Sequence, residues 1–347
     1  MQISMPINYA GGFEASARQV VDLEKAGLDI AWIAEAYGFD GVSYMGYLAA
    51  KTERVQIGSG ILPIYTRTPT LLAMTAAGVD ALSGGRCVLG LGASGPQVIE
   101  GFHGVVYDKP LARTREIVSI CRDVWAREAP LTNAGPLYPI PVPAGQGTGL
   151  GKPLKIIGRP VRSRIPVYIA SLGEKNVELT AEIADGWLPI FYVPEKANDV
   201  FGKALAAGKA KRPADLGPLE VAAGGVVCIT DDEAQAASVR DFGRAMAALY
   251  IGGMGAKGKN FYNALVSRYG YEQEAAEIQD LYLAGNKQEA AAKVPAELLE
   301  KTSLCGPEGY IKDRIAAYKE AGVTVLQITP FAENTAEVVE KLKTWTT

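Results

Sequence analysis

The sequence alternates, through most of its length, between short continuous apolar runs and longer segments whose apolar residues recur every three or four positions. In segment 15–26, Val20, Leu23 and Ala26 fall on one stripe of a helix, and Gly27 follows where that helix would end. Continuous apolar runs are typical of strands that are buried on both faces of a parallel sheet. The runs that we expect to form strands are 3–7, 30–34, 55–60, 87–91, 166–170, 187–190, 221–229 and 323–329.

Eight strand–helix units that close on one another form a (β/α)8 TIM barrel, an α/β fold that usually takes about 250 residues. The expected helices are 15–26, 42–50, 69–82, 174–184, 195–210 and 336–342. Residues 1–347 would then form a single domain with two insertions. One, at 127–164 after the fourth strand, is rich in proline and glycine; the other, at 252–304 after the seventh, starts with a glycine–lysine loop. We expect both to line the mouth of the barrel. A doubly wound open sheet would give similar signals, and only the count of eight strands argues against it.

The composition excludes several classes of function. The chain has 35 Lys and Arg against 38 Asp and Glu, so no basic surface for nucleic acid is indicated. No apolar run is long enough to span a membrane, and no signal-peptide pattern is present, so we expect a soluble, cytoplasmic protein. The four cysteines form no CxxC pair and His103 is the single histidine, so we expect no metal site. Hydride transfer from an organic cofactor, which needs little help from acids and bases, becomes the favoured chemistry.

Two glycine-rich segments match phosphate-binding motifs but have simpler explanations. Segment 90–95 (GLGASG) matches GxGxxG after a strand, but Pro96 follows it and no acid ends a second strand at the required distance. Segment 82–86 (LSGGR) matches the signature of an ATP-binding cassette, but the sequence has no Walker A lysine loop. A glycine that ends a helix explains the second segment. Neither segment therefore predicts nucleotide binding.

Three segments at the expected carboxyl ends of strands carry candidate site residues. Segment 58–63 (GSGILP) has two glycines and a proline, which favour a bulge or an unusual peptide bond. Glu35 ends the second strand, either as a polar residue of the barrel mouth or as a proton donor. Segment 170–173 (ASLG) precedes a helix, where backbone N–H groups can bind an anion. An ordinary N-cap at Ser171 is the alternative for this segment.

Together these segments resemble the luciferase-like oxidoreductases, and in particular the branch that uses the deazaflavin coenzyme F420. The resemblance is carried by 58–61 (GSGI), 82–86 (LSGGR), 182–187 (EIADGW), and 307–310 (PEGY) leading to 321–323 (AGV). These segments span nearly the whole chain in the family's order. The methylenetetrahydromethanopterin reductases are similar over the first hundred residues. The resemblance implies a (β/α)8 barrel with the cofactor lying across the carboxyl ends of the strands.

The resemblance also implies roles for individual residues. It places a non-prolyl cis peptide bond between Gly60 and Ile61, behind the deazaflavin ring, and puts Glu35 near the carbon that transfers the hydride. Segment 170–173, with Gly186 and Trp187, would receive the phosphate and side chain of the cofactor, which differs from the usual phosphate site of these barrels after strands seven and eight. The residues expected to bind the cofactor are Gly60, Ile61, Gly92, Ser94, Ala170, Ser171, Leu172, Gly173, Gly186 and Trp187.

The expected reaction is hydride transfer between C5 of the deazaflavin and a small organic substrate. Glu35 would be the catalytic acid, helped by Tyr37 or His103, and backbone N–H groups would stabilise the negative charge of the reduced cofactor. Two positions depart from the family pattern. Ala36 follows Glu35 where many relatives have histidine, and segment 95–97 (GPQ) stands where several have an acid. The alternatives are an FMN-dependent monooxygenase of the same superfamily and a non-catalytic barrel that carries the cofactor. We expect a homodimer that binds neither nucleic acid nor membranes.

Overall fold

Parallel pairing closes the central sheet on itself. Across residues 1–8 and 10–347, which the computed structural model describes, the strands pair in the order β10-β1-β2-β3-β5-β6-β7-β8, and β10 also pairs with β8. Val325 of β10 lies beside Gln2 on one side and Ala222 on the other. This closure confirms the (β/α)8 barrel and excludes the open sheet, which would leave two strand edges unpaired. The barrel strands are β1 (Gln2–Ile7), β2 (Ile30–Ile33), β3 (Gln56–Ser59), β5 (Cys87–Gly92), β6 (Val167–Ile169), β7 (Gly186–Trp187), β8 (Glu220–Ile229) and β10 (Val325–Pro330); the short strands β4 (Leu62–Pro63) and β9 (Leu304–Gly306) pair with β5 and β8.

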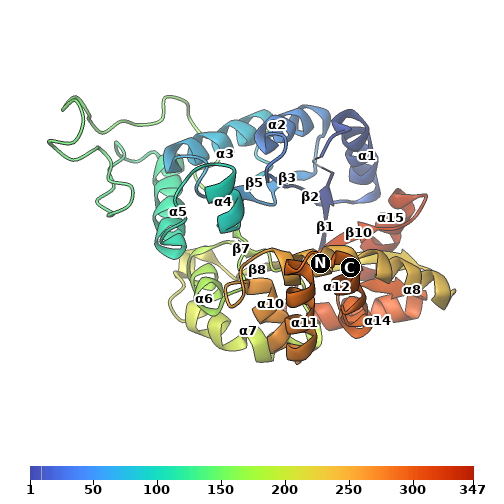
Figure 1. Ribbon diagram of the computed structural model, residues 1–347. Helices are drawn as coiled ribbons and strands as arrows, with labels where there is room; N and C mark the ends of the chain where they lie inside the picture. Colours follow the sequence, from blue (N-terminus) through green and yellow to red (C-terminus); the bar gives the residue numbers. More distant parts are fainter. Residues whose placement is uncertain (9) are drawn as a thin grey trace.

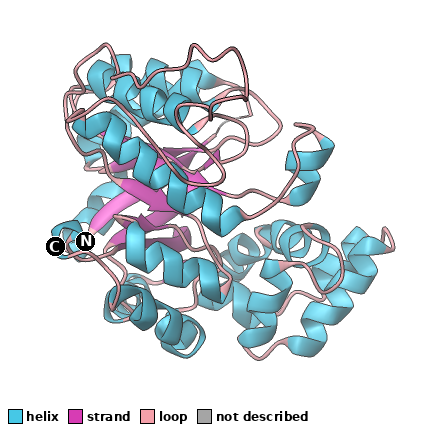
Figure 2. Cartoon of the chain, turned by 90° about the vertical axis from the view of Figure 1, so that its left-hand side faces the viewer, coloured by secondary structure: helices cyan, strands magenta, loops and turns pink. Residues whose placement is uncertain are grey.

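Helices surround the strands on the outside of the barrel (Figures 1 and 2). Their ends follow the local sequence signals. In the third helix, for example, the Thr68 side chain caps the N-terminus, Pro69 opens the first turn, and Gly84 ends the helix with φ 69°. The helices are α1 (Phe13–Ala26), α2 (Gly41–Lys51), α3 (Pro69–Ser83), α4 (Pro96–Gly101), α5 (Pro110–Ala126), α6 (Glu174–Ile183), α7 (Pro194–Lys209), α8 (Glu233–Phe242), α9 (Arg244–Ala248), α10 (Phe261–Arg268), α11 (Glu272–Leu283), α12 (Lys287–Ala292), α13 (Ala296–Lys301), α14 (Glu308–Glu320) and α15 (Thr335–Thr346), with a 3-10 turn at Ala214–Leu216 and a π-helical turn at Leu249–Gly253.

Two aromatic rings fill much of the barrel interior. Trp32 and Tyr168 are buried, and their ring centroids lie 5.4 Å apart. A Cβ atom placed on Gly58 would lie 2.3 Å from the Trp32 ring, and one placed on Gly186 would lie 2.3 Å from the Tyr168 ring. Each ring therefore occupies space that only a glycine leaves open.

The first insertion follows the helix after the fourth barrel strand, not the strand itself. It begins after α5, not at the end of β5, so its two ends lie at the amino-terminal edge of the barrel. Near its end, Arg162 binds Asp80 and the carbonyl of Cys87, the first residue of β5. Only the stretch around Tyr138, whose hydroxyl accepts a hydrogen bond from Arg113 at 3.0 Å, approaches the start of α5. Figure 1 shows this segment (green) projecting beside α5. The two ends of the insertion therefore lie away from the mouth, because the chain returns through α5 before the insertion starts, and the expectation that the insertion lines the mouth stays a prediction.

The second insertion follows β8 and α8 and contains the expected loop at 254–259 between the π-helical turn and α10. The sixth strand is shorter than the predicted 187–190, because Pro189 has no N–H group to donate to a neighbouring strand. Within the described part of the chain, no helix is both long and apolar enough to cross a membrane.

The carboxylate of Glu24 on α1 binds the chain that leads into β3. Its oxygens accept the backbone N–H groups of Glu53, Arg54 and Val55, the last at 2.7 Å. Burial alone would raise the pKa of Glu24, but the three backbone hydrogen bonds outweigh it and lower the pKa below its ordinary value of 4.5. A carboxyl group whose pKa is depressed in the folded state stabilises the fold above its ordinary pKa, and that contribution is lost as the pH falls through the folded value.

We therefore expect Glu24→Gln to lower the free energy of unfolding by about 2 kcal/mol at pH 7, since a buried charged acceptor of backbone N–H groups is lost. The difference from the parent should shrink as the pH falls below 4.5. Urea unfolding at pH 7 and at lower pH measures both quantities. Glu53→Gln, at the exposed neighbour, is the control and should change stability little. A loss of the same size for Glu24→Gln at every pH would contradict the role of the charge.

Candidate active site

The carboxyl ends of the barrel strands meet at one edge, because all the strands are parallel. The residues that the sequence singled out follow such ends. Glu35 comes after β2, Gly60 and Ile61 after β3, and segment 170–173 after β6, whereas Gly92 is the last residue of β5. The fold therefore brings most of the expected residues to the same rim.

The peptide bond between Gly60 and Ile61 is cis, which confirms the prediction for this bond. The Gly60 N–H donates to the carbonyl of Ile33 at 2.7 Å, and the Ile61 carbonyl accepts from the Glu35 N–H at 3.2 Å. The side chain of Ile61 lies across Gly92, since a Cβ atom there would be 2.9 Å from Cγ1 of Ile61 and 3.6 Å from Cβ of Ala170. Gly92 is buried beneath Ile61, so the partly exposed residues Ile61 and Ala170 form this part of the rim.

Glu35 lies in a buried ion pair. Its Oε1 accepts from Arg67 Nη1 at 2.5 Å, and its Oε2 accepts from Arg67 Nη2 at 2.8 Å and from the Gly41 N–H at 2.9 Å. The two side chains are only 9% and 13% exposed. The hydrogen bond to Glu35 raises the pKa of Arg67, although burial opposes this shift. The pair joins the loop after β2 to the loop before α3 and neutralises the charge at this part of the rim.

Asp40 completes this network at the surface. Its Oδ1 accepts from Arg67 at 2.8 Å, and its other oxygen accepts from the N–H and hydroxyl of Ser43 at the start of α2. Burial works toward a higher pKa, but the Ser43 hydrogen bonds and the Arg67 charge lower the pKa of Asp40. Arg67 was not among the residues predicted from the sequence. A mostly buried acid at the end of a strand needs a cation nearby, and this requirement is the signal that could have suggested Arg67.

His103 and Ser94 lie on either side of the short helix α4. Ser94 is exposed and adopts a positive φ of 58°, and its carbonyl accepts a long hydrogen bond from the Tyr107 hydroxyl. The side chain of His103 is partly buried, and its Nε2 has no hydrogen-bond partner among the described residues. The neighbouring Phe102 lies 6.1 Å from Tyr37, ring to ring. The loops after β2 and β5 therefore touch, one residue away from His103.

Segment 170–173 forms the turn into α6. The N-cap of this helix is Gly173, and no side chain caps it. The expected alternative, a cap from Ser171, does not occur, because the Ser171 hydroxyl pairs with that of Thr180 at 2.8 Å. The N-terminus of α6 therefore has no side-chain acceptor of its own, as a site for a bound anion requires.

Gly186 and Trp187 lie behind this turn and do not line it. Trp187 is fully buried, and its indole N–H donates to the carbonyl of Ser171 at 2.9 Å. Gly186 faces the ring of Tyr168 inside the barrel. Neither side-chain position faces the turn in this structure, and the expectation that both residues bind the cofactor stays a prediction. Trp187 supports the turn from behind, because its side chain points outward from the strand, toward Phe201 at 5.0 Å.

The second insertion supplies residues that the sequence did not single out. The ring of Phe261 lies over the α6 turn, 3.2 Å from where a Cβ atom on Gly173 would be. The adjacent Tyr262 lies 4.7 Å from Tyr250 and 6.4 Å from Phe191, ring to ring. No pattern in the sequence indicated the contact between Phe261 and Gly173, because the second insertion comes close to this turn only when the chain is folded.

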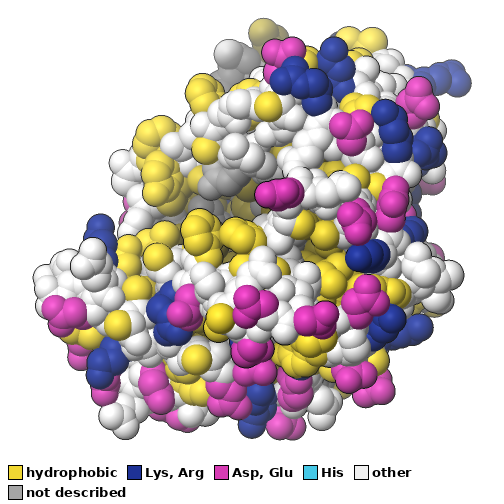
Figure 3. Space-filling model, turned by 90° about the vertical axis from the view of Figure 1, so that its right-hand side faces the viewer, with side chains coloured by type: hydrophobic (Ala, Val, Ile, Leu, Met, Phe, Trp, Pro, Cys, Tyr) yellow, Lys and Arg dark blue, Asp and Glu magenta, His cyan; other side chains and the backbone are white. Residues whose placement is uncertain are grey.

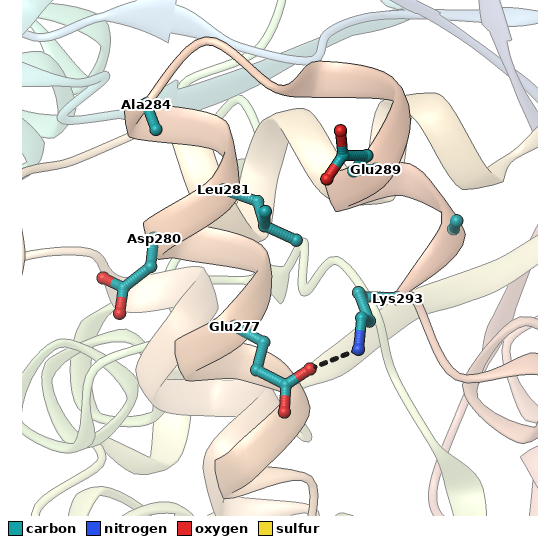
Figure 4. A pocket seen from close by; sticks show the side chains of 7 residues that line it. Glu277, Asp280, Leu281, Ala284, Glu289 and Lys293 are labelled. Atoms are coloured by element: carbon teal, nitrogen blue, oxygen red, sulfur yellow. Dashed lines mark ion pairs between the residues drawn. The ribbon is translucent and has the colours of Figure 1, made fainter.

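A groove of about 570 Å³ elsewhere in this insertion is not part of the site (Figure 4). Its lining comes from α11, α12 and their flanks, and Glu277 pairs with Lys293 across it at 2.7 Å. None of its residues follows a barrel strand. Among the described residues, no group of three His, Cys, Asp or Glu side chains is placed to hold a metal ion.

Comparison with known proteins gives the family. Residues 2–325 match the family described as luciferase-like monooxygenase. The chain belongs to this luciferase-like family. A relative in Mycobacterium tuberculosis (strain ATCC 25618 / H37Rv), which carries the name of a coenzyme F420-dependent oxidoreductase, Rv3520c, is 42% identical over 335 residues, or 95% of each chain.

Solved structures of low sequence identity share this luciferase-like barrel. The coenzyme F420-dependent tetrahydromethanopterin reductase of Methanopyrus kandleri has a TM-score of 0.76 at 21% identity, over 98% of this chain and 96% of that one. The oxygenating constituent of 3,6-diketocamphane monooxygenase from Pseudomonas putida, in complex with FMN, has a TM-score of 0.60 at 16% identity, over 94% and 91%. At these identities the likeness shows the fold alone.

For Glu35 we expect a structural effect that can be measured without substrate. Glu35→Gln removes the charge that Arg67 faces in a mostly buried position, so the free energy of unfolding should fall by about 3 kcal/mol. Chemical unfolding checks this value. Glu14→Gln is the matched control, because Glu14 pairs with Arg18 at 3.0 Å but both side chains are largely exposed; it should cost less than about 1 kcal/mol. Equal effects of the two changes would show that the Glu35 pair adds no stability beyond a surface pair.

Proposed function

We propose that the protein is a coenzyme F420-dependent oxidoreductase that transfers a hydride between C5 of the deazaflavin and an organic substrate. The observation that carries the proposal is the 42% identity, over 95% of both chains, to the relative named for F420-dependent oxidoreduction. The position of the expected residues at one rim of the barrel supports it. The FMN-dependent monooxygenase is the second candidate, favoured by the fold shared with the FMN complex from Pseudomonas putida.

The residues at the rim fit a planar cofactor with a phosphate. The side chain of Ile61 fills the space beside Gly92, so the packed and partly exposed residues Ile61 and Ala170 can lie against a flat ring. The N-terminus of α6, without a side-chain cap, offers N–H groups and the positive end of the helix dipole to a phosphate. In this proposal Gly60 and Ile61 support the ring, and Leu172 and Gly173 bind the phosphate. Ser94, exposed after β5, borders the same site.

When bound, the deazaflavin would supply or accept the hydride, and the residues of the chain would handle the proton and exclude water. Glu35 and His103 are the two candidates for the residue that donates the proton. Glu35 would have to loosen its pair with Arg67 before it could donate a proton, whereas Nε2 of His103 makes no hydrogen bond with the described residues. The ion pair therefore favours Glu35 as a residue that positions Arg67 and the loop after β2.

The test of this function is a titration of the purified protein with F420 and with FMN, followed by cofactor fluorescence. We expect saturable quenching of F420 and none of FMN at the same concentrations. In the same titration Gly173→Asp should weaken F420 binding at least tenfold, because a carboxylate would face the phosphate at the N-terminus of α6.

Two control variants separate charge from shape in this titration. Gly173→Ala adds the same Cβ atom beside Phe261 without a charge, so its F420 affinity should stay closer to that of the parent. Gly309→Asp puts the same charge into the first turn of α14, where a Cβ atom meets nothing within 4 Å. Loss of affinity in Gly309→Asp and not in Gly173→Asp would move the phosphate to that helix. Binding of FMN and not F420 would replace the proposed function by the second candidate.

We also propose that two copies of the chain associate through α2 and α3. Leu71, Met74 and Leu82 recur on one face of α3 and are 45%, 55% and 68% exposed, and Tyr47 of α2 is also exposed. No charged residue of α3 lies on this stripe, so an apolar stripe of a second copy would complement it.

Met74→Glu should convert a dimer to a monomer in light scattering. Leu150→Glu, at an exposed position of the first insertion, should not. A monomeric parent would contradict the proposal.

A further inference from the structure

Exposed aromatic side chains recur at the carboxyl edge of the barrel. We name as the aromatic rim the residues Tyr37, Phe39, Phe102, Phe261 and Phe331, which are 67%, 59%, 65%, 61% and 49% exposed. Tyr37 and Phe39 follow β2, Phe102 ends α4 after β5, Phe331 follows β10, and Phe261 lies over the turn after β6. These strand ends are distributed around the barrel, so the rim borders the mouth on several sides.

Short-range contacts connect the rim to neighbouring rings. Tyr37 lies 6.1 Å from Phe102, and Phe331 lies 6.2 Å from the exposed Phe242 of α8, ring to ring. Figure 3 shows hydrophobic side chains gathered around a hollow on one face of the molecule. Isolated apolar side chains are common on protein surfaces, but a concentration of large rings at the open end of a barrel is typical of a ligand site.

The positive charge beside the proposed cofactor site is fully paired. Arg67 contacts both Glu35 and Asp40, so two carboxylates face one guanidinium and no positive charge is left over. Tyr262, next to Phe261 in the chain, lies near Tyr107, and burial raises the pKa of both phenols, so both stay uncharged at neutral pH. An anionic substrate would find no unpaired cation in this group of residues, whereas a neutral apolar one would cover the rings.

We infer that the aromatic rim selects a neutral, hydrophobic organic substrate, larger than the reacting carbon and its immediate substituents. This inference rests on the proposed function, because the rim borders the place proposed for the cofactor. The rings would bury the apolar body of the substrate and leave its reacting group toward Ile61 and Ala170. The loops would thus determine which class of substrate is accepted, whereas the strand ends would form the surface that binds the cofactor.

The test uses the full-length protein with F420 present and the neutral dye Nile red as the probe. Nile red fluorescence should rise saturably, and 2-decanone should displace the dye, whereas decanoate, which has the same chain length and a charge, should not. Phe102→Ser and Phe331→Ser should each weaken Nile red binding about tenfold, as expected when one partly buried ring contact is lost. Leu150→Ser, 84% exposed on the first insertion, is the matched control and should leave the affinity unchanged.

The same samples distinguish this inference from the proposed function. F420 quenching by the two rim variants should equal that of the parent. Equal Nile red binding by the parent and both rim variants overturns the inference, and so does displacement by decanoate as strong as by 2-decanone. A loss of F420 affinity in the rim variants also overturns it, because the rings would then cover the cofactor. Absence of F420 quenching by the parent overturns the proposed function and is seen independently of the dye.

Discussion

The structure depends on the fit of two large rings against glycines inside a closed barrel. Trp32 occupies the place of a side chain at Gly58, and Tyr168 does the same at Gly186. The Tyr168 hydroxyl donates to the carboxyl of Glu220, whose pKa is raised by burial. Barrel interiors are packed with side chains. Here two rings fill a space that several smaller side chains would otherwise fill. The neighbouring strands can approach the rings because they have a glycine at the point of contact. The carboxyl ends of the strands lie directly above this packed layer of rings.

Above this layer of rings, the shape of the candidate site is maintained by contacts that lie behind its surface. The buried indole of Trp187 fixes the turn at Ser171, and the carbonyl of Ile61 holds the start of the loop at Glu35. The Glu35–Arg67 pair joins two loops that are far apart in the sequence. These contacts give the rim a defined shape before any ligand binds, which is what a site for a rigid planar cofactor needs.

The two parts of the mouth have different origins in the chain. The surface proposed for the cofactor comes from strand ends, whose positions follow from barrel closure. The aromatic rim comes from loops and from the second insertion, where Phe261 reaches the turn at Gly173. Loops accept changes of length and composition without loss of the core. Proteins that share this barrel can therefore differ in the molecules that they accept.

The sequence by itself determined the eight barrel strands, most of the outer helices and the segments that lie at the rim. Continuous apolar runs such as that of β2 can only be buried on both faces, and glycines such as Gly60 and Gly84 mark positions where the backbone departs from regular geometry. These signals are local, so they survive without knowledge of the fold.

Only the tertiary structure decided which of these residues meet. Arg67 lies 32 positions from Glu35, and the pairing of their charges depends on two loops that approach one another only when the barrel closes. The direction of Trp187 depends on strand register, which turned its side chain away from the mouth, and the place of the first insertion depends on the return of the chain through α5. Contacts between distant segments follow from the packing of the whole molecule. A one-dimensional pattern records which residues must be buried, but not what they are buried against.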